Sequence, residues 1–181
     1  MTVPAPTPTS LSQRALQDFR QGRFSDAAEG FRAAREAYAQ AGDLPAAAEA
    51  ANNQGVALLQ AGRPQEARRA VEGTLDVFER AGDPARAAQA VGNLASAADA
   101  CGDPEVAERL YQAAVERFAA LGDGAAQAIV LNSLSQLQLK RGRPLEALTT
   151  MQTGLEHKPR RSLRDRWLQR LLRLPSRLLR G

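Results

Sequence analysis

The chain has 181 residues, of which 44% are hydrophobic but only 4% aromatic, and its formal net charge is +4. It is long enough to bury a sizeable core, and much of its apolar content is alanine, so we expect closely packed elements with small side chains between them. Cys101 is the single cysteine, which excludes an intrachain disulfide and favours a reducing compartment, and no apolar run approaches the roughly 20 residues of a membrane span.

The first nine residues differ in composition from the rest of the chain. Residues 1–9 are rich in proline and threonine, and they lack both the basic and the apolar part of a secretion signal. We expect them to form a disordered lead-in. Ser10 is predicted to cap the first helix, with Gln13 three residues later completing a capping box.

A glycine recurs every twenty residues through most of the chain. The series is Gly22, Gly42, Gly62, Gly82, Gly102, Gly122 and Gly142. The intervals are rich in Ala, Leu, Gln, Glu and Arg, which favour helices, so each interval is predicted to be one helix. Asp83-Pro84 supplies an N-cap followed by proline at the first helical position. Arg or Asp follows alternate glycines, with Asp103 as the one departure, so the repeat is forty residues and consists of two antiparallel helices.

Four such repeats are predicted, at about 10–42, 43–82, 83–122 and 123–157. When they are aligned on the glycine between the paired helices, the same positions carry small or large side chains throughout. The four aligned sets are Ala15, Gly55, Ala95 and Ser135; Ala27, Ala67, Ala107 and Ala147; the larger Phe31, Val71, Tyr111 and Met151; and Ala34, Thr74, Ala114 and Gly154. We expect the small residues to face one another where the two helices cross.

This spacing resembles the tetratricopeptide repeat family over residues 10 to about 157. The family's usual period is about 34 residues; the forty-residue period here, with ANNQG at 51–55 and VGNLA at 91–95, is similar to the long-repeat branch typified by kinesin light chains. LNSLS at 131–135 fits that pattern less closely, and LSQRA at 11–15 has no asparagine. The resemblance implies an all-α, right-handed α-solenoid whose first helices line a concave groove. It also implies a non-catalytic scaffold that holds an extended peptide or a helix of a partner protein.

Amide side chains on the predicted first helices are the candidate groove residues. They are Asn52, Asn53, Gln89, Asn93, Asn132 and Gln136. A primary amide both donates and accepts hydrogen bonds, which suits the unpaired backbone of an extended peptide. Alternatively, some of these amides cap or bridge neighbouring helices. Asn52 and Asn53 cannot both face one way, because adjacent helical residues point about 100° apart.

The predicted groove is neutral. Ser12, Gln89 and Asn93 stand where carboxylate-clamping members of the resembled family carry Lys or Arg. Apolar patches are expected from Leu16, Val56 and Leu59. An acidic C-terminal peptide is therefore not the expected ligand.

No catalytic residue, metal site or cofactor is predicted. His157 is the only histidine, and no nucleophile or second ligand lies at a motif spacing from it. The glycines are each separated by twenty residues and form no phosphate-binding cluster. We therefore expect a protein that is not an enzyme.

The C-terminal segment, residues 158–181, has nine basic residues against Asp165 alone, a net charge of +8, so residues 1–157 carry −4. Its apolar and basic residues recur at helical spacing on opposite sides, which predicts an amphipathic helix that is kinked or broken at Pro175. Three roles are open: a cap on the last repeat, contact with an anionic membrane surface, or binding of nucleic acid or a ribonucleoprotein. The residues expected to contact the membrane or another anionic partner are Arg166, Trp167, Arg170, Arg173, Arg177, Leu178 and Arg180. We expect a cytoplasmic protein, peripheral on the cytoplasmic face of a membrane if the second role holds.

Overall fold

A computed structural model describes residues 6–157, and every regular element in that range is a helix. The all-α prediction is therefore confirmed for the described residues. The chain divides into two compact units, Met1–Ala107 and Glu108–Gly181. The amphipathic helix predicted at 158–181 lies outside the described residues.

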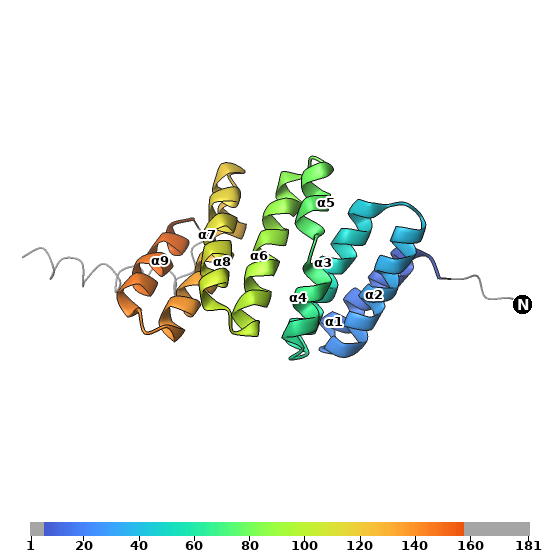
Figure 1. Cartoon of the computed structure of the whole chain (residues 1–181), viewed down its shortest axis with the longest axis horizontal. Helices are drawn as coiled ribbons and strands as arrows, with labels where there is room; N and C mark the ends of the chain where they lie inside the picture. Colours follow the sequence, from blue (N-terminus) through green and yellow to red (C-terminus); the bar gives the residue numbers. More distant parts are fainter. Residues whose placement is uncertain (1–5, 158–181) are drawn as a thin grey trace, which may run out of the picture. The chain divides into compact units, whose positions relative to one another are not determined.

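The first unit is built from consecutive helices that pack against their neighbours. They are α1 (Pro8–Arg20), α2 (Phe24–Gln40), α3 (Leu44–Gln60), α4 (Pro64–Val71), α5 (Thr74–Arg80) and α6 (Pro84–Cys101), followed by the start of α7 (Pro104–Ala120). Figure 1 shows α1 beside α2, and α3 contacts α2, α4, α5 and α6. The first helices α1 and α3 therefore belong to two consecutive antiparallel pairs, as predicted.

The second unit contains the rest of α7, α8 (Gly124–Lys140) and α9 (Pro144–His157). The helices α8 and α9 form a closely packed pair. A Cβ added at Gly154 of α9 would lie 3.2 Å from the Cβ of Leu131 on α8, which shows how near the two backbones approach.

Each of the seven evenly spaced glycines forms the same helix-ending turn. Their φ values lie between 66° and 83°, a left-handed conformation that favours glycine. In the first turn the N–H of Gly22 donates to the carbonyl of Phe19, and the N–H of Arg23 donates to that of Asp18. The same pair of bonds recurs at every member of the series and defines a Schellman motif. The strict period is thus the spacing of one repeated turn.

The aligned small residues form the centre of the helix pairs. In each repeat, the residue that lies five positions after the glycine between the paired helices is at most 1% exposed. These residues are Ala27, Ala67, Ala107 and Ala147. In the first unit, a Cβ added at Gly30 of α2 would lie 2.8 Å from the Cβ of Ala15 on α1. A small residue of each helix thus meets the other at this crossing, although Gly30 is not a member of the aligned sets.

Two details of the predicted elements are wrong. The first helix begins at Pro8, because Thr7 rather than Ser10 is its cap: the Thr7 Oγ1 accepts from the backbone N–H of Ser10 at 3.2 Å. The interval between Gly62 and Gly82 holds two helices instead of one, because Gly73 takes a φ of 78° between α4 and α5.

Candidate functional site: a pocket among the first three helices

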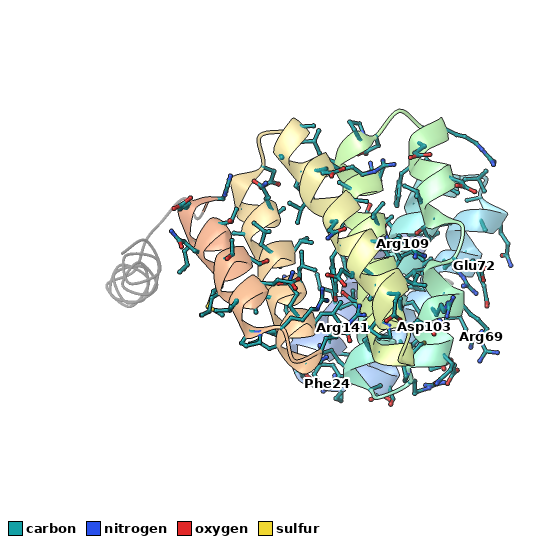
Figure 2. All side chains as sticks on the ribbon, turned by 60° about the vertical axis from the view of Figure 1, so that its left-hand side comes forward. Phe24, Arg69, Glu72, Asp103, Arg109 and Arg141 are labelled. Atoms are coloured by element: carbon teal, nitrogen blue, oxygen red, sulfur yellow. The ribbon has the colours of Figure 1, made fainter. Side chains whose placement is uncertain are left out.

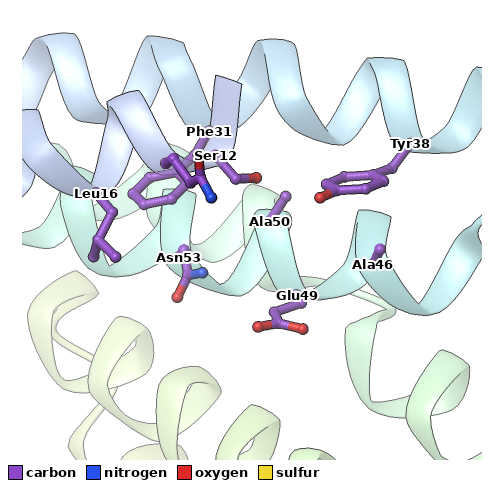
Figure 3. A pocket seen from close by; sticks show the side chains of 9 residues that line it. Ser12, Leu16, Phe31, Tyr38, Ala46, Glu49, Ala50 and Asn53 are labelled. Atoms are coloured by element: carbon purple, nitrogen blue, oxygen red, sulfur yellow. The ribbon is translucent and has the colours of Figure 1, made fainter. Parts of the chain in front are cut away.

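A pocket of about 200 Å³ lies where α1, α2 and α3 meet in the first unit (Figure 3). Its apolar lining comes from all three helices, and its polar lining includes a hydroxyl pair, two amides and one carboxylate. The lining residues are Ser12, Gln13, Leu16, Phe31, Tyr38, Ala46, Glu49, Ala50 and Asn53. This volume is below the roughly 300 to 1,000 Å³ of typical small-molecule sites, so the pocket suits a side chain better than a cofactor.

Helical spacing brings the residues of α3 to the pocket. Ala46, Glu49, Ala50 and Asn53 follow one another at steps of three, one and three, so they lie on one face of α3. Figure 3 shows Tyr38 and Phe31 entering the region from α2, with Glu49 and Asn53 pointing away from α2. The Tyr38 hydroxyl donates to Thr9 Oγ1 at 3.3 Å, which fixes the ring against α1.

Asn52 is not a groove residue, which corrects the prediction. It is 4% exposed, and its Oδ1 accepts a hydrogen bond from the Thr74 hydroxyl at 3.0 Å. The Thr74 hydroxyl also lies 2.8 Å from the carbonyl of Val71, the last residue of α4. Asn52 therefore has the helix-bridging role that was the alternative interpretation of these amides, and it supports the interruption between α4 and α5.

The other predicted amides lie at the surface. Asn53 is half-buried in the pocket, and on α6 of the same unit Asn93 is half-buried and Gln89 exposed. Gln89 and Asn93 are four residues apart, as are Glu49 and Asn53, so each pair lies on one face of its helix.

The two amides of the second unit, Asn132 and Gln136, are exposed on α8, again four residues apart. They are therefore accessible. Their contact with a ligand stays a prediction.

One carboxylate and one guanidinium determine the charge beside the pocket. Glu49 Oε2 accepts from Arg86 Nη1 at 3.1 Å, and Arg86 Nε donates to Asp83 Oδ2 at 2.7 Å. The Arg86 guanidinium also lies over the Phe78 ring, 5.6 Å from its centroid. The backbone N–H of Arg86 and then its guanidinium hold the pKa of Asp83 below its usual range, so Asp83 is ionised at neutral pH. Two carboxylates thus share one cation.

The sequence did not lead us to predict three of the residues that line the pocket, Glu49, Tyr38 and Ala50. Both polar residues have a signal in the repeat alignment. Glu49 stands four residues before Asn53, where the next repeat has Gln89 before Asn93. Tyr38 occupies the position of Phe78 and Phe118 and is the member of that set with a hydroxyl.

The sequence pattern of the family described as "Tetratricopeptide repeat" matches residues 6–80 and again 86–160. The chain belongs to the tetratricopeptide repeat family. A comparison with curated proteins gave no match. Tetratricopeptide repeats generally mediate protein–protein interaction and are generally non-catalytic.

The described part of this tetratricopeptide repeat protein also lacks the features of a metal site and of a membrane-spanning helix. Within residues 6–157, no three His, Cys, Asp or Glu side chains are grouped so that they could hold a metal ion. In the same range, none of the helices has the length and apolar character needed to cross a membrane.

Proposed function

We propose that this tetratricopeptide repeat protein is an interaction module that holds an extended segment of a partner protein over the pocket of α1, α2 and α3. The observation that carries the proposal is the combination, in one hollow, of an apolar lining with the half-buried Asn53 amide. An extended segment has backbone N–H and C=O groups without internal partners, and they lose water when it binds. The Asn53 amide can both donate to and accept from such a backbone.

The pocket provides the apolar contribution. Leu16 is 41% exposed at its edge, and Phe31 and Ala50 lie below the surface at 3% and 2%. A partner side chain that enters would remove apolar surface from water on both sides, at about 25 cal/mol for each Å² buried. Gln89 and Asn93 on α6, at the repeat positions of Glu49 and Asn53, are proposed as further backbone contacts.

A random heptapeptide library selected on the full chain tests this proposal. Peptides enriched on the unchanged protein should lose about tenfold in affinity on a Leu16→Ala, Asn53→Ala variant, since one apolar contact and one hydrogen-bonding group are removed. The matched control is Leu139→Ala, Gln112→Ala, which removes an exposed leucine and an exposed amide side chain from the second unit, neither of them a candidate groove residue. Equal affinities for the two variants would refute the proposal.

A second proposal concerns the C-terminal segment and rests on its sequence. We propose that Trp167 and Leu178 enter the headgroup region of an anionic membrane while Arg166, Arg170, Arg173, Arg177 and Arg180 attract its lipids, at about 1 kcal/mol for each basic residue. This would hold a cytoplasmic module at the membrane surface.

Chain truncation provides the test of the membrane proposal. A chain that ends at Arg173 should bind vesicles containing phosphatidylserine less tightly than the full chain does, and salt should weaken both. Equal vesicle binding by the two chains would leave capping as the role. Tighter binding to RNA than to vesicles, lost on the same truncation, would favour the nucleic-acid alternative.

A further inference from the structure

We infer that the segment held in this pocket carries a lysine or arginine next to the apolar side chain that enters it. The inference rests on the proposed function and specifies the chemistry of the partner. It follows from the charges that surround the pocket and from the carboxylate at its edge.

No residue that lines the pocket is basic, and Glu49 is the one acidic side chain among them. Arg86 contacts this lining through Glu49, and it is shared between Glu49 and Asp83. The three groups together carry a net charge of −1. A cationic partner side chain could therefore pair with the Glu49 carboxylate, whereas an acidic one would be repelled by it.

Arg86 is held more firmly by Asp83 than by Glu49. It is 2.7 Å from Asp83 and 3.1 Å from Glu49, and its stacking on Phe78 keeps it close to α5 and α6. The Glu49 side chain is 58% exposed, compared with 28% for Asp83. Glu49 can therefore accept a second donor from the solvent side of the pocket while Arg86 keeps its place.

The Glu49 carboxylate and the Asn53 amide are one helical turn apart on α3. A segment whose backbone contacts Asn53 would thus place a neighbouring side chain near Glu49. Of the side chains that could lie there, lysine and arginine have a charge opposite to that of Glu49.

The random heptapeptide library tests this charge preference directly. Peptides enriched on the full chain should contain Lys or Arg beside a large apolar residue about two to five times as often as Gln, as expected for an exposed charge pair. Raising the salt concentration to about 0.5 M should reduce that preference.

Glu49→Gln should abolish the preference for Lys and Arg and keep the preference for an apolar residue. The substitution introduces the side chain that the next repeat has at Gln89, so the fold is expected to accept it. The matched control is Glu36→Gln, which removes an equal charge from an exposed site on α2 outside the pocket. Glu36→Gln should leave the preference unchanged.

The results separate this inference from the function on which it rests. Apolar peptides that depend on Leu16 and Asn53 but show no excess of Lys or Arg would overturn the inference alone. Peptides that bind the Leu16→Ala, Asn53→Ala variant as tightly as the unchanged protein would overturn the proposed function itself.

Two other occupants of the pocket would also contradict the inference. If residues 158–181 fill it, an enriched heptapeptide should displace them and shift the emission of Trp167, the only tryptophan; we expect no shift. If a second copy of the chain fills it, sedimentation should show a dimer that the Leu16→Ala, Asn53→Ala variant abolishes; we expect no such difference.

Discussion

Asn52 and Asn53 are neighbours on α3, yet their side chains have separate roles. Asn52 is buried and accepts from Thr74, whereas Asn53 is half-buried in the pocket. A turn of about 100° between adjacent helical residues is enough to place one in the core and the other at the surface. Replacement by alanine should therefore lower stability at Asn52 and weaken peptide binding at Asn53.

Asn52→Ala should lower the free energy of unfolding by about 1 to 2 kcal/mol, because a buried hydrogen bond is lost, and should leave the affinity for enriched heptapeptides unchanged. Asn53→Ala should change stability by less than about 0.5 kcal/mol and weaken peptide binding. Urea denaturation and fluorescence anisotropy measure the two quantities. If Asn53→Ala unfolds the chain as readily as Asn52→Ala does, then Asn53 is structural.

Glu108 in the second unit joins two arginines of the turn between α8 and α9. Its Oε2 lies 2.7 Å from Arg143 Nη2 and 2.8 Å from Arg141 Nη1, and its side chain is 15% exposed. The hydrogen bond from Arg143, followed by the positive charges of Arg143 and Arg141, lowers the pKa of Glu108. Arg141 is labelled in Figure 2.

The lowered pKa gives a pH-dependent contribution to stability. Because the carboxylate is favoured in the folded state, its contribution is complete above the ordinary pKa of 4.5 and disappears as pH falls through the lower folded-state pKa. Glu108→Gln should therefore cost about 1 kcal/mol at pH 7, at the upper end for partly exposed pairs, and almost nothing near pH 2. Thermal melts of both proteins between pH 7 and pH 2 measure this difference in stability. A difference that persists near pH 2 would show that it does not come from the ionised Glu108 carboxylate.

The individual residues of the pocket could be predicted only in part. Asn53 was predicted because asparagine recurs at Asn93, and Leu16 because it is an apolar residue of a predicted first helix. The separate burial of Asn52 depends on Thr74, which lies 22 residues away along the chain. Helical spacing shows which residues share a face. It does not show which face a neighbouring helix covers, and this is why Glu49 and Tyr38 were missed.

At the scale of elements, the two kinds of turn begin the next helix in different ways. The Asp of the Gly-Asp turns at Asp43, Asp83 and Asp123 accepts from a backbone N–H three residues later. The Arg of the Gly-Arg turns instead pairs with an acidic side chain three residues later: Arg23 with Asp26, Arg63 with Glu66 and Arg143 with Glu146. Both kinds of contact hold the first turn of a helix.

The one departure from the alternation also has a structural reason. Asp103 replaces the expected arginine, and its carboxylate pairs with Arg68 of α4 at 2.5 Å (Figure 2 labels Asp103). In the second unit the signs are reversed, since Arg143 occupies the turn and Glu108 occupies the position corresponding to Arg68. At these two turns, the residue after the glycine is thus opposite in charge to its partner on the preceding second helix.

The crossing of α1 and α2 should be sensitive to a single methyl group. Gly30→Ala would bring its Cβ within 2.8 Å of the Ala15 Cβ and 3.3 Å of the Ala15 Cα, so the two helices must move apart. Overpacking costs about 1 to 3 kcal/mol, and helix propensity returns up to about 1 kcal/mol, so we expect a net loss near 1 kcal/mol. Adding Ala15→Gly should restore most of it. Equal stability of Gly30→Ala and the unchanged protein in urea would show that the crossing is not tight.

The interruption between α4 and α5 was not predicted, although its cause is a single residue. Gly73 falls between the regular glycines, where other repeats have Ala33, Ala113 and Thr153, and an interior glycine is compatible with a continuous helix. What stabilises the break is the Thr74 hydroxyl, which contacts the carbonyl of Val71 and the amide of Asn52. Glu72, at the break, is exposed and is labelled in Figure 2.

At the scale of the whole molecule, the repeat period predicted most of the fold. A helix end that needs a left-handed residue can be recognised from the sequence, and seven such ends at equal spacing determine the helices between them. The start of α1 was placed three residues late, because Thr7 and Ser10 are both good caps and Pro8 favours the earlier one. The sequence of residues 158–181 leaves three roles open, because a basic amphipathic helix suits a cap on the last repeat, an anionic membrane surface and nucleic acid alike.

The most direct test of the account is to map the amide resonances of the full chain on addition of an enriched heptapeptide. Binding at the pocket predicts that the largest shifts cluster on α1 and α3 around Leu16, Glu49 and Asn53, with smaller ones near Gln89 and Asn93 of α6. Asn132 and Gln136 serve as reporters for the second unit. Shifts confined to α9 or to residues 158–181, with α1 and α3 unchanged, would contradict it.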